Sequence, residues 1–105
     1  MEKYILIWEN IAGEIVSKAF SDGENAKEHF AVISRTCSKV HFSEWTQIQD
    51  GLWKCDLFSN SMISYDFEEE GWFIQPLENG RFLSGIVDLY YKFSDCVKVL
   101  CGYPE

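Results

Sequence analysis

The sequence predicts an α+β domain in which a mostly antiparallel sheet carries one helix on one of its faces. Three observations lead to this prediction. Ser21–Thr36 shows apolar residues at helical spacing, short runs rich in β-branched and aromatic residues fill most of the remaining chain, and Asp-Gly and Asn-Gly pairs separate some of these runs. At 105 residues the chain has a common domain size, so we expect a single domain spanning residues 1–105.

The first two elements are predicted to be strands joined by a short turn. Lys3–Trp8 contains a nearly continuous apolar run, and Glu14–Phe20 follows after the turn Glu9–Gly13. Both runs are rich in the β-branched and aromatic residues that suit strands. A hairpin is therefore expected to lead directly into the helix.

The helix is predicted over residues 21–36. Ser21 and Glu24 fit a capping box, in which each side chain accepts a hydrogen bond from the other residue's backbone N–H. Arg35 is expected in the last turn, where a cation suits the unpaired carbonyl groups. A helix this short depends on tertiary cover for its apolar stripe, which the sheet must provide. That stripe consists of Ala26, Phe30, Ile33 and Cys37.

Two further strands, Lys39–Ile48 and Leu52–Phe58, are predicted to form a hairpin around Asp50 and Gly51. An Asp-Gly pair between alternating runs indicates a two-residue turn, because both positions need positive φ. This turn would pair Ile48 with Trp53.

The register of this hairpin decides which side chains face the core. Pairing Ile48 with Trp53 turns Glu44 inward and turns Trp45 and Phe58 away from the helix. Trp45 and Phe58 then become the best candidates for exposed aromatic residues. The alternative left open is that a second helix, from the C-terminal segment, covers this face.

The next two strands are predicted at Met62–Phe67 and Trp72–Leu77, and Asn79-Gly80 provides another turn signal. A two-residue turn there pairs Pro76 with Leu83. Proline has no backbone N–H to donate, so the strand is expected to end at Pro76 or to lie at an edge.

The last quarter of the chain fits two interpretations. Ile86–Phe93 and Cys96–Cys101 are rich in strand-forming residues, and we favour strands. The alternative is a helix, because apolar residues also recur at helical spacing and Asp88 and Lys92 stand four residues apart. That stripe would consist of Ile86, Leu89, Phe93, Val97 and Leu100.

The charge balance limits the possible partners. The net charge is −8, from 17 acidic and 9 basic residues, and residues 36–105 carry eleven acids and five bases. Direct binding to nucleic acid or to an anionic membrane normally needs a basic face, so both are excluded. A basic protein remains a suitable partner.

No apolar run reaches the length of a membrane span, and the N-terminus lacks a secretory pattern, so we expect a cytoplasmic protein with reduced thiols.

Neither metal chemistry nor catalysis has a specific motif in this chain. The metal candidates are Cys37 with His41 and Cys96 with Cys101, but their spacing is looser than that of usual zinc-ligand pairs. No phosphate-binding loop, dinucleotide fingerprint or nucleophile elbow occurs. We therefore predict a non-catalytic protein without a cofactor. The alternatives are a small-molecule or metal-binding domain and, third, an enzyme that uses Glu44 or His41.

The densest charge cluster combines acidic and aromatic residues. It can be a solvated turn, which is the usual role of a run of charges. Such a run beside aromatic residues also resembles the rim and anchors of a protein interface. We therefore predict a small acidic binding module, of the inhibitor or immunity-protein kind, that masks a basic, nucleic-acid-binding surface of a target such as a nucleic-acid-binding enzyme. The predicted contact residues are Trp45, Phe58, Tyr65, Asp66, Glu68, Glu69, Glu70 and Trp72.

Overall fold

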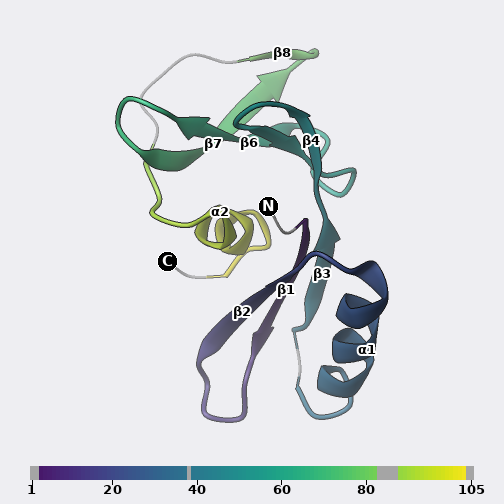
Figure 1. The fold of residues 1–105 in the computed structure, drawn as a ribbon. Helices are drawn as coiled ribbons and strands as arrows, with labels where there is room; N and C mark the ends of the chain where they lie inside the picture. Colours follow the sequence, from purple (N-terminus) through teal and green to yellow (C-terminus); the bar gives the residue numbers. More distant parts are fainter. Residues whose placement is uncertain (1–2, 38, 83–87, 104–105) are drawn as a thin grey trace. The chain divides into compact units, whose positions relative to one another are not determined.

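The computed structural model describes residues 3–37, 39–82 and 88–103. It is an α+β fold with two antiparallel sheets and two helices, one of which packs against the first sheet, so the predicted fold class is confirmed (Figure 1). The chain divides into two compact units, Met1–Glu44 and Trp45–Glu105. The assignment of all 105 residues to one domain stays a prediction.

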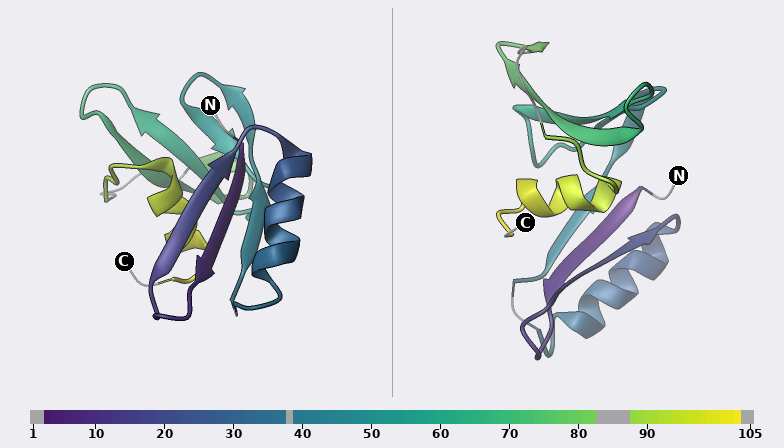
Figure 2. Two further views of the ribbon diagram at one scale, coloured as in Figure 1. Left: turned by 60° about the horizontal axis from the view of Figure 1, so that its bottom comes forward. Right: turned by 90° about the vertical axis from the view of Figure 1, so that its left-hand side faces the viewer.

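The first unit is a three-stranded antiparallel sheet with a helix on one face (Figure 2). Leu6, Phe20 and Ala26 form a buried core cluster. Half-buried side chains, such as those of Trp8 and Ile33, pack against it. The strand order is β2-β1-β3, with β1 in the centre. In chain order the elements are β1 (Tyr4–Glu9), β2 (Ile15–Phe20), α1 (Gly23–Ile33) and β3 (His41–Glu44).

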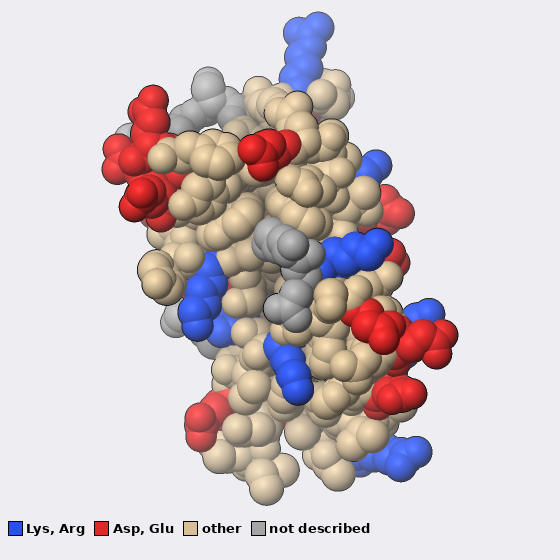
Figure 3. Space-filling model, viewed as in Figure 1, with Lys and Arg blue, Asp and Glu red and all other residues tan. Residues whose placement is uncertain are grey.

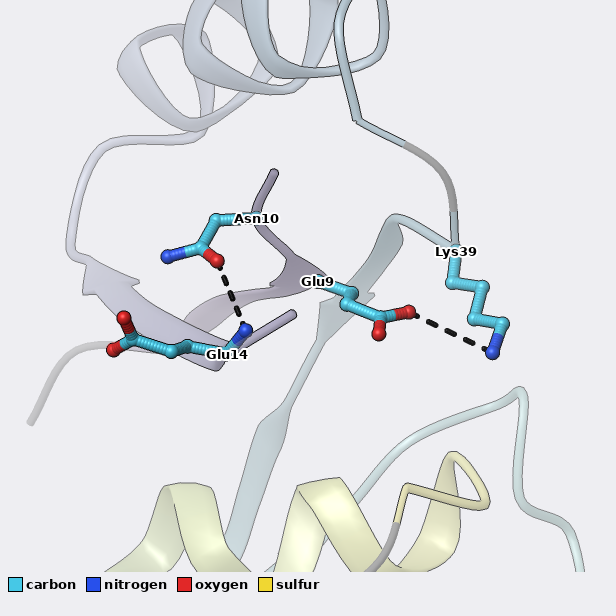
Figure 4. Close-up of polar contacts among 4 residues, drawn as sticks. All are labelled: Glu9, Asn10, Glu14 and Lys39. Carbon is cyan, nitrogen blue, oxygen red and sulfur yellow. Dashed lines mark hydrogen bonds and ion pairs between the residues drawn. The ribbon is translucent and has the colours of Figure 1, made fainter. Parts of the chain in front are cut away.

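The turn between β1 and β2 is held by Asn10. Its Oδ1 accepts hydrogen bonds from the backbone N–H groups of Ala12 at 3.0 Å and Glu14 at 2.9 Å (Figure 4). Beside it, the Glu9 carboxylate lies 3.6 Å from Nζ of Lys39, which joins the start of the turn to the approach to β3. Ile11 at the tip is 94% exposed. The predicted turn at 9–13 therefore exists and is built on side-chain bonds to the backbone.

Helix α1 is shorter than predicted and begins at a different cap. Asp22, not Ser21, is the N-cap, because its backbone is extended and its Oδ1 accepts from the N–H of Glu24 at 3.0 Å. Asp and Ser are equally good caps and stand side by side here, so the pattern alone selected the wrong one. The helix ends at Ile33, so Arg35 lies beyond its last turn and not within it.

The predicted strand Lys39–Ile48 is two strands in two different sheets. β3 ends at Glu44 and pairs with β1, whereas β4 (Thr46–Gln49) begins after Trp45 and pairs with β5 (Leu52–Lys54). The predicted register is also wrong. Trp53 pairs with Gln47, because the register shifts between Gln47 and Gln49. A shift of this kind changes which side chains face the core, which periodicity alone does not predict.

The second unit contains the other strands in a continuous order, β4-β5-β6-β7-β8. Asn79 and Gly80 have φ of 53° and 75°, as the predicted turn requires. The strand before this turn continues two residues beyond Pro76, contrary to an end at Pro76, while the expected partner Leu83 lies outside the described residues. The further elements are β6 (Ser61–Asp66), β7 (Gly71–Glu78), β8 (Arg81–Phe82) and α2 (Phe93–Leu100).

The preference for strands in the last quarter is wrong where the structure describes it. Residues 93–100 form α2, with Phe93, Cys96 and Val97 buried on one face. The helical stripe therefore outweighed the strand propensity of these residues, which depends strongly on context. Leu89 precedes the helix in an irregular segment, and Ile86 lies outside the described residues.

The core of the second unit is organised around the ring of Phe93. Three tryptophan rings lie within 6 Å of it by ring centroid: Trp45 at 5.3 Å, Trp53 at 5.8 Å and Trp72 at 5.2 Å. All three contacts are edge-to-face, with interplanar angles of 87°, 71° and 87°. This geometry is the favoured one for aromatic pairs, since the positive ring edge meets the negative face. Phe93 thereby joins α2 to residues beside or within β4, β5 and β7.

We expect Phe93→Ala to lower the free energy of unfolding by about 3–5 kcal/mol, because it removes the ring that all three tryptophans contact. The matched control is Phe82→Ala, the same chemical change at a side chain that is 55% exposed in β8. The control should cost less than about 1 kcal/mol. Urea denaturation followed by circular dichroism measures both, and equal losses would contradict the central role of Phe93.

The cap assignment predicts that Asp22→Ala lowers stability by about 1 kcal/mol, since the N–H of Glu24 loses its acceptor. Ser21→Ala should change stability by less than about 0.5 kcal/mol, although the sequence pattern assigns the cap to Ser21. Thermal unfolding of the two variants separates these assignments. A larger loss for the Ser21 variant would restore the capping box.

Candidate acidic-aromatic surface

The acidic residues 66–70 lie in a well-defined turn, Asp66–Gly71, which we call the acidic turn. It joins β6 to β7 in the second unit, and Figure 3 shows acidic side chains gathered at this end of that unit. Oδ1 of Asp66 accepts from the backbone N–H groups of Glu68 at 2.9 Å and Glu69 at 3.1 Å. The side chains of Glu68, Glu69 and Glu70 are exposed. One carboxylate therefore fixes the backbone from which three others project into solvent.

Phe67 is an exposed ring held in a fixed place within the acidic turn. Its side chain is 63% exposed, yet it lies against the neighbouring Asp50-Gly51 turn. A Cβ added at Gly51 would lie only 2.9 Å from Cε2 of Phe67, and the Tyr65 and Phe67 ring centroids are 5.0 Å apart. Phe67 was not among the predicted contact residues, although it stands two residues after Tyr65 and so shares a face with it in the predicted strand Met62–Phe67.

Tyr65 and Trp72 connect this surface to the core. Both are half-buried, and their ring centroids are 4.9 Å apart. Trp72 also contacts Phe93, and its backbone forms two hydrogen bonds with Tyr90, at 2.8 and 2.7 Å. Of the predicted contact residues, the structure therefore brings together Tyr65, Asp66, Glu68, Glu69, Glu70 and Trp72.

Trp45 does not belong to this surface, and the expectation that it is exposed is wrong. Trp45 is 0% exposed, with its ring stacked on Phe58 at 5.8 Å and edge-on to Phe93. Phe58 is half-buried in that stack. The alternative of a second, C-terminal helix covering this face accounts for the burial, because Phe93 is the first residue of α2.

Glu44 does not point into the core, contrary to the predicted register. Its side chain is largely exposed, and its Oε1 lies 4.0 Å from Nζ of Lys3. The buried residue at this point of β3 is Ser43. An exposed ion pair of this length stabilises little, about 0–1 kcal/mol. Glu44 therefore lies at the surface and not in a buried site.

The candidate metal ligands are divided between the two units. Cys37 and His41 belong to the first unit, and Cys96 and Cys101 to the second. Among the residues that the structure describes, no group of three or more His, Cys, Asp or Glu side chains is placed to hold a metal ion.

Burial also raises the pKa of two of these thiols, those of Cys96 and Cys101. Burial, with a smaller effect of the Asp95 charge, raises the pKa of Cys96 to about 12. Burial, with a smaller effect of Cys55, raises the pKa of Cys101 to about 11. Both groups therefore remain thiols at neutral pH, whereas electrophiles react with the thiolate.

No protein-family model, curated protein or solved structure matches this chain. None of the helices in the described ranges is long and apolar enough to cross a membrane.

At pH 8, iodoacetamide should label Cys96 much more slowly than Cys37 in the folded protein. Cys96 is fully buried and its raised pKa keeps the thiolate fraction very small, whereas Cys37 is partly exposed. Mass spectrometry of digested samples taken over time measures both rates. In urea the two cysteines should react at similar rates, and equal rates without urea would contradict the described burial.

Proposed function

We propose that this chain is a small, non-catalytic binding module of the cytoplasm that masks a basic surface on another protein. Its contact surface is the acidic turn, which includes Phe67. Tyr65 packs against Phe67, and Trp72 packs against Tyr65. A protein surface that otherwise binds nucleic acid has the required positive charge. The proposed role is therefore that of an inhibitor or immunity-type protein directed at such a target.

The observation that carries the proposal is an exposed aromatic ring, fixed in position, among exposed carboxylates. Interfaces commonly combine aromatic anchors with a polar, charged rim. Phe67 can serve as the anchor because Gly51 and Tyr65 already limit its movement, so little side-chain freedom would be lost on binding. Glu68, Glu69 and Glu70 can serve as the rim.

The charge distribution supports a basic partner. Residues 45–105, the second unit, carry ten acidic and four basic residues, and four of those acids lie in the acidic turn. Such a concentration attracts positively charged surfaces and speeds the first encounter. It also repels nucleic acid, so the chain would compete with nucleic acid for the same surface instead of binding it.

We expect replacement of Glu68, Glu69 and Glu70 by Gln to reduce recovery of the partner in affinity purification from the native host. The variant removes three rim charges and keeps Asp66, which holds the turn. With a purified partner, the association rate of the wild type should fall by about tenfold or more from low to high salt, and that of the variant by less. Surface plasmon resonance measures both rates.

The matched control replaces Glu14, Glu28 and Glu78 by Gln, which removes the same charge from exposed positions elsewhere. This control should retain the partner. A second comparison sets Phe67→Ala against Leu57→Ala, since Leu57 is similarly exposed at 68%. Loss of binding for the Phe67 variant alone supports an anchor. The proposal would be overturned if affinity purification recovered only acidic partners, or if binding did not depend on salt. It would also be overturned if the two triple variants reduced binding equally.

A further inference from the structure

A small hollow lies on the second unit, and none of the residues of the acidic turn lines it. It has a volume of about 210 Å³. For comparison, an engineered cavity of about 150 Å³ binds benzene. The hollow is therefore large enough for one ring or one branched side chain with a small polar group, and too small for a nucleotide-sized ligand.

The wall of the hollow is held in place by backbone bonds and by an aromatic stack. The N–H of Phe58 donates to the carbonyl of Cys55 at 3.0 Å, and the ring of Phe58 stacks on the buried Trp45 at 5.8 Å. On the opposite strand, the N–H of Leu77 donates to the carbonyl of Asn60 at 2.8 Å. A site with fixed walls loses little freedom when a ligand enters.

The lining combines an apolar wall with two opposite charges. Phe58, Met62 and Leu77 provide the apolar surface, and buried Cys55 lies between Lys54 and Asp56 in sequence. Both charged side chains are exposed, and neither takes part in an ion pair with another described residue. One cation and one anion are thus available at the edge of one apolar hollow.

We propose that this hollow binds a free α-amino acid with a single-ring or branched apolar side chain. The side chain would lie against Phe58, Met62 and Leu77. The α-carboxylate would face the Lys54 ammonium, and the α-ammonium would face the Asp56 carboxylate. A zwitterion matches this lining better than a simple anion or cation, because each of those would meet one charge of its own sign.

The test uses three probes: L-phenylalanine, 3-phenylpropionate, which lacks the ammonium group, and phenethylamine, which lacks the carboxylate. Titration followed by amide NMR shifts of residues 54–62 should show the tightest binding for L-phenylalanine. Each truncated probe should bind about threefold more weakly, the size expected for a solvent-exposed charge contact. Glycine, which has no side chain for the apolar wall, should bind more weakly still.

Two charge variants assign the contacts. Lys54→Gln should remove the preference for L-phenylalanine over phenethylamine, and Asp56→Asn should remove the preference for L-phenylalanine over 3-phenylpropionate. Each variant should leave the other preference intact. Lys27→Gln and Glu28→Gln, at exposed positions on α1, should leave both preferences intact, and circular dichroism confirms that all variants are folded. The proposal would be overturned if L-phenylalanine caused no amide shifts, or if all the probes bound with equal affinity. It would also be overturned if the α1 variants changed the preferences as much as the Lys54 and Asp56 variants do. The outcome is independent of the acidic turn.

Discussion

The second unit depends on the burial of one phenylalanine ring among three tryptophans. Phe93 contacts Trp45, which precedes β4, Trp53 in β5 and Trp72 in β7. This single ring holds α2 against strands that are far apart in the sequence. A small sheet with one apolar face needs such a cover to be stable. Without it, the aromatic side chains of the second unit would be exposed to water at a large cost in free energy.

The same ring contacts extend outward to the candidate surface. Phe93 contacts Trp72, Trp72 contacts Tyr65, and Tyr65 contacts Phe67, with centroid distances of 5.2, 4.9 and 5.0 Å. The exposed ring of Phe67 is therefore the last member of a packed series that begins in the core. This continuity explains how an exposed side chain can keep a defined position, which isolated surface side chains usually lack.

The first unit was largely predictable, because its elements are local. The apolar run at Tyr4–Trp8, the turn at 9–13 and the apolar stripe of α1 each indicated the correct element. The helix cap, the end of the helix and the direction of Glu44 differed. The second unit was less predictable. The break at Trp45 and the shifted register after Gln47 are not marked in the local alternation of the sequence. The burial of Trp45 involves its contact with Phe93 of α2, which is about fifty residues away in sequence. Periodicity within a short window contains no information about such contacts.

The candidate surface was predictable where local sequence determines it. A run of carboxylates between two strands indicated an exposed turn, and Asp66 to Glu70 form one. Trp45 could not be separated from Trp72 by composition or alternation, because only the three-dimensional packing distinguishes a buried ring from a half-buried one.

The arrangement of the indoles also gives the molecule an intrinsic optical reporter. Three of the four tryptophans surround one ring in the second unit, and the fourth, Trp8, is half-buried in the first. Intrinsic emission therefore follows mainly the second unit. Replacement of Trp8 by Phe would leave a tryptophan spectrum belonging to that unit alone, so the folding of the second unit can be followed by itself without an added dye.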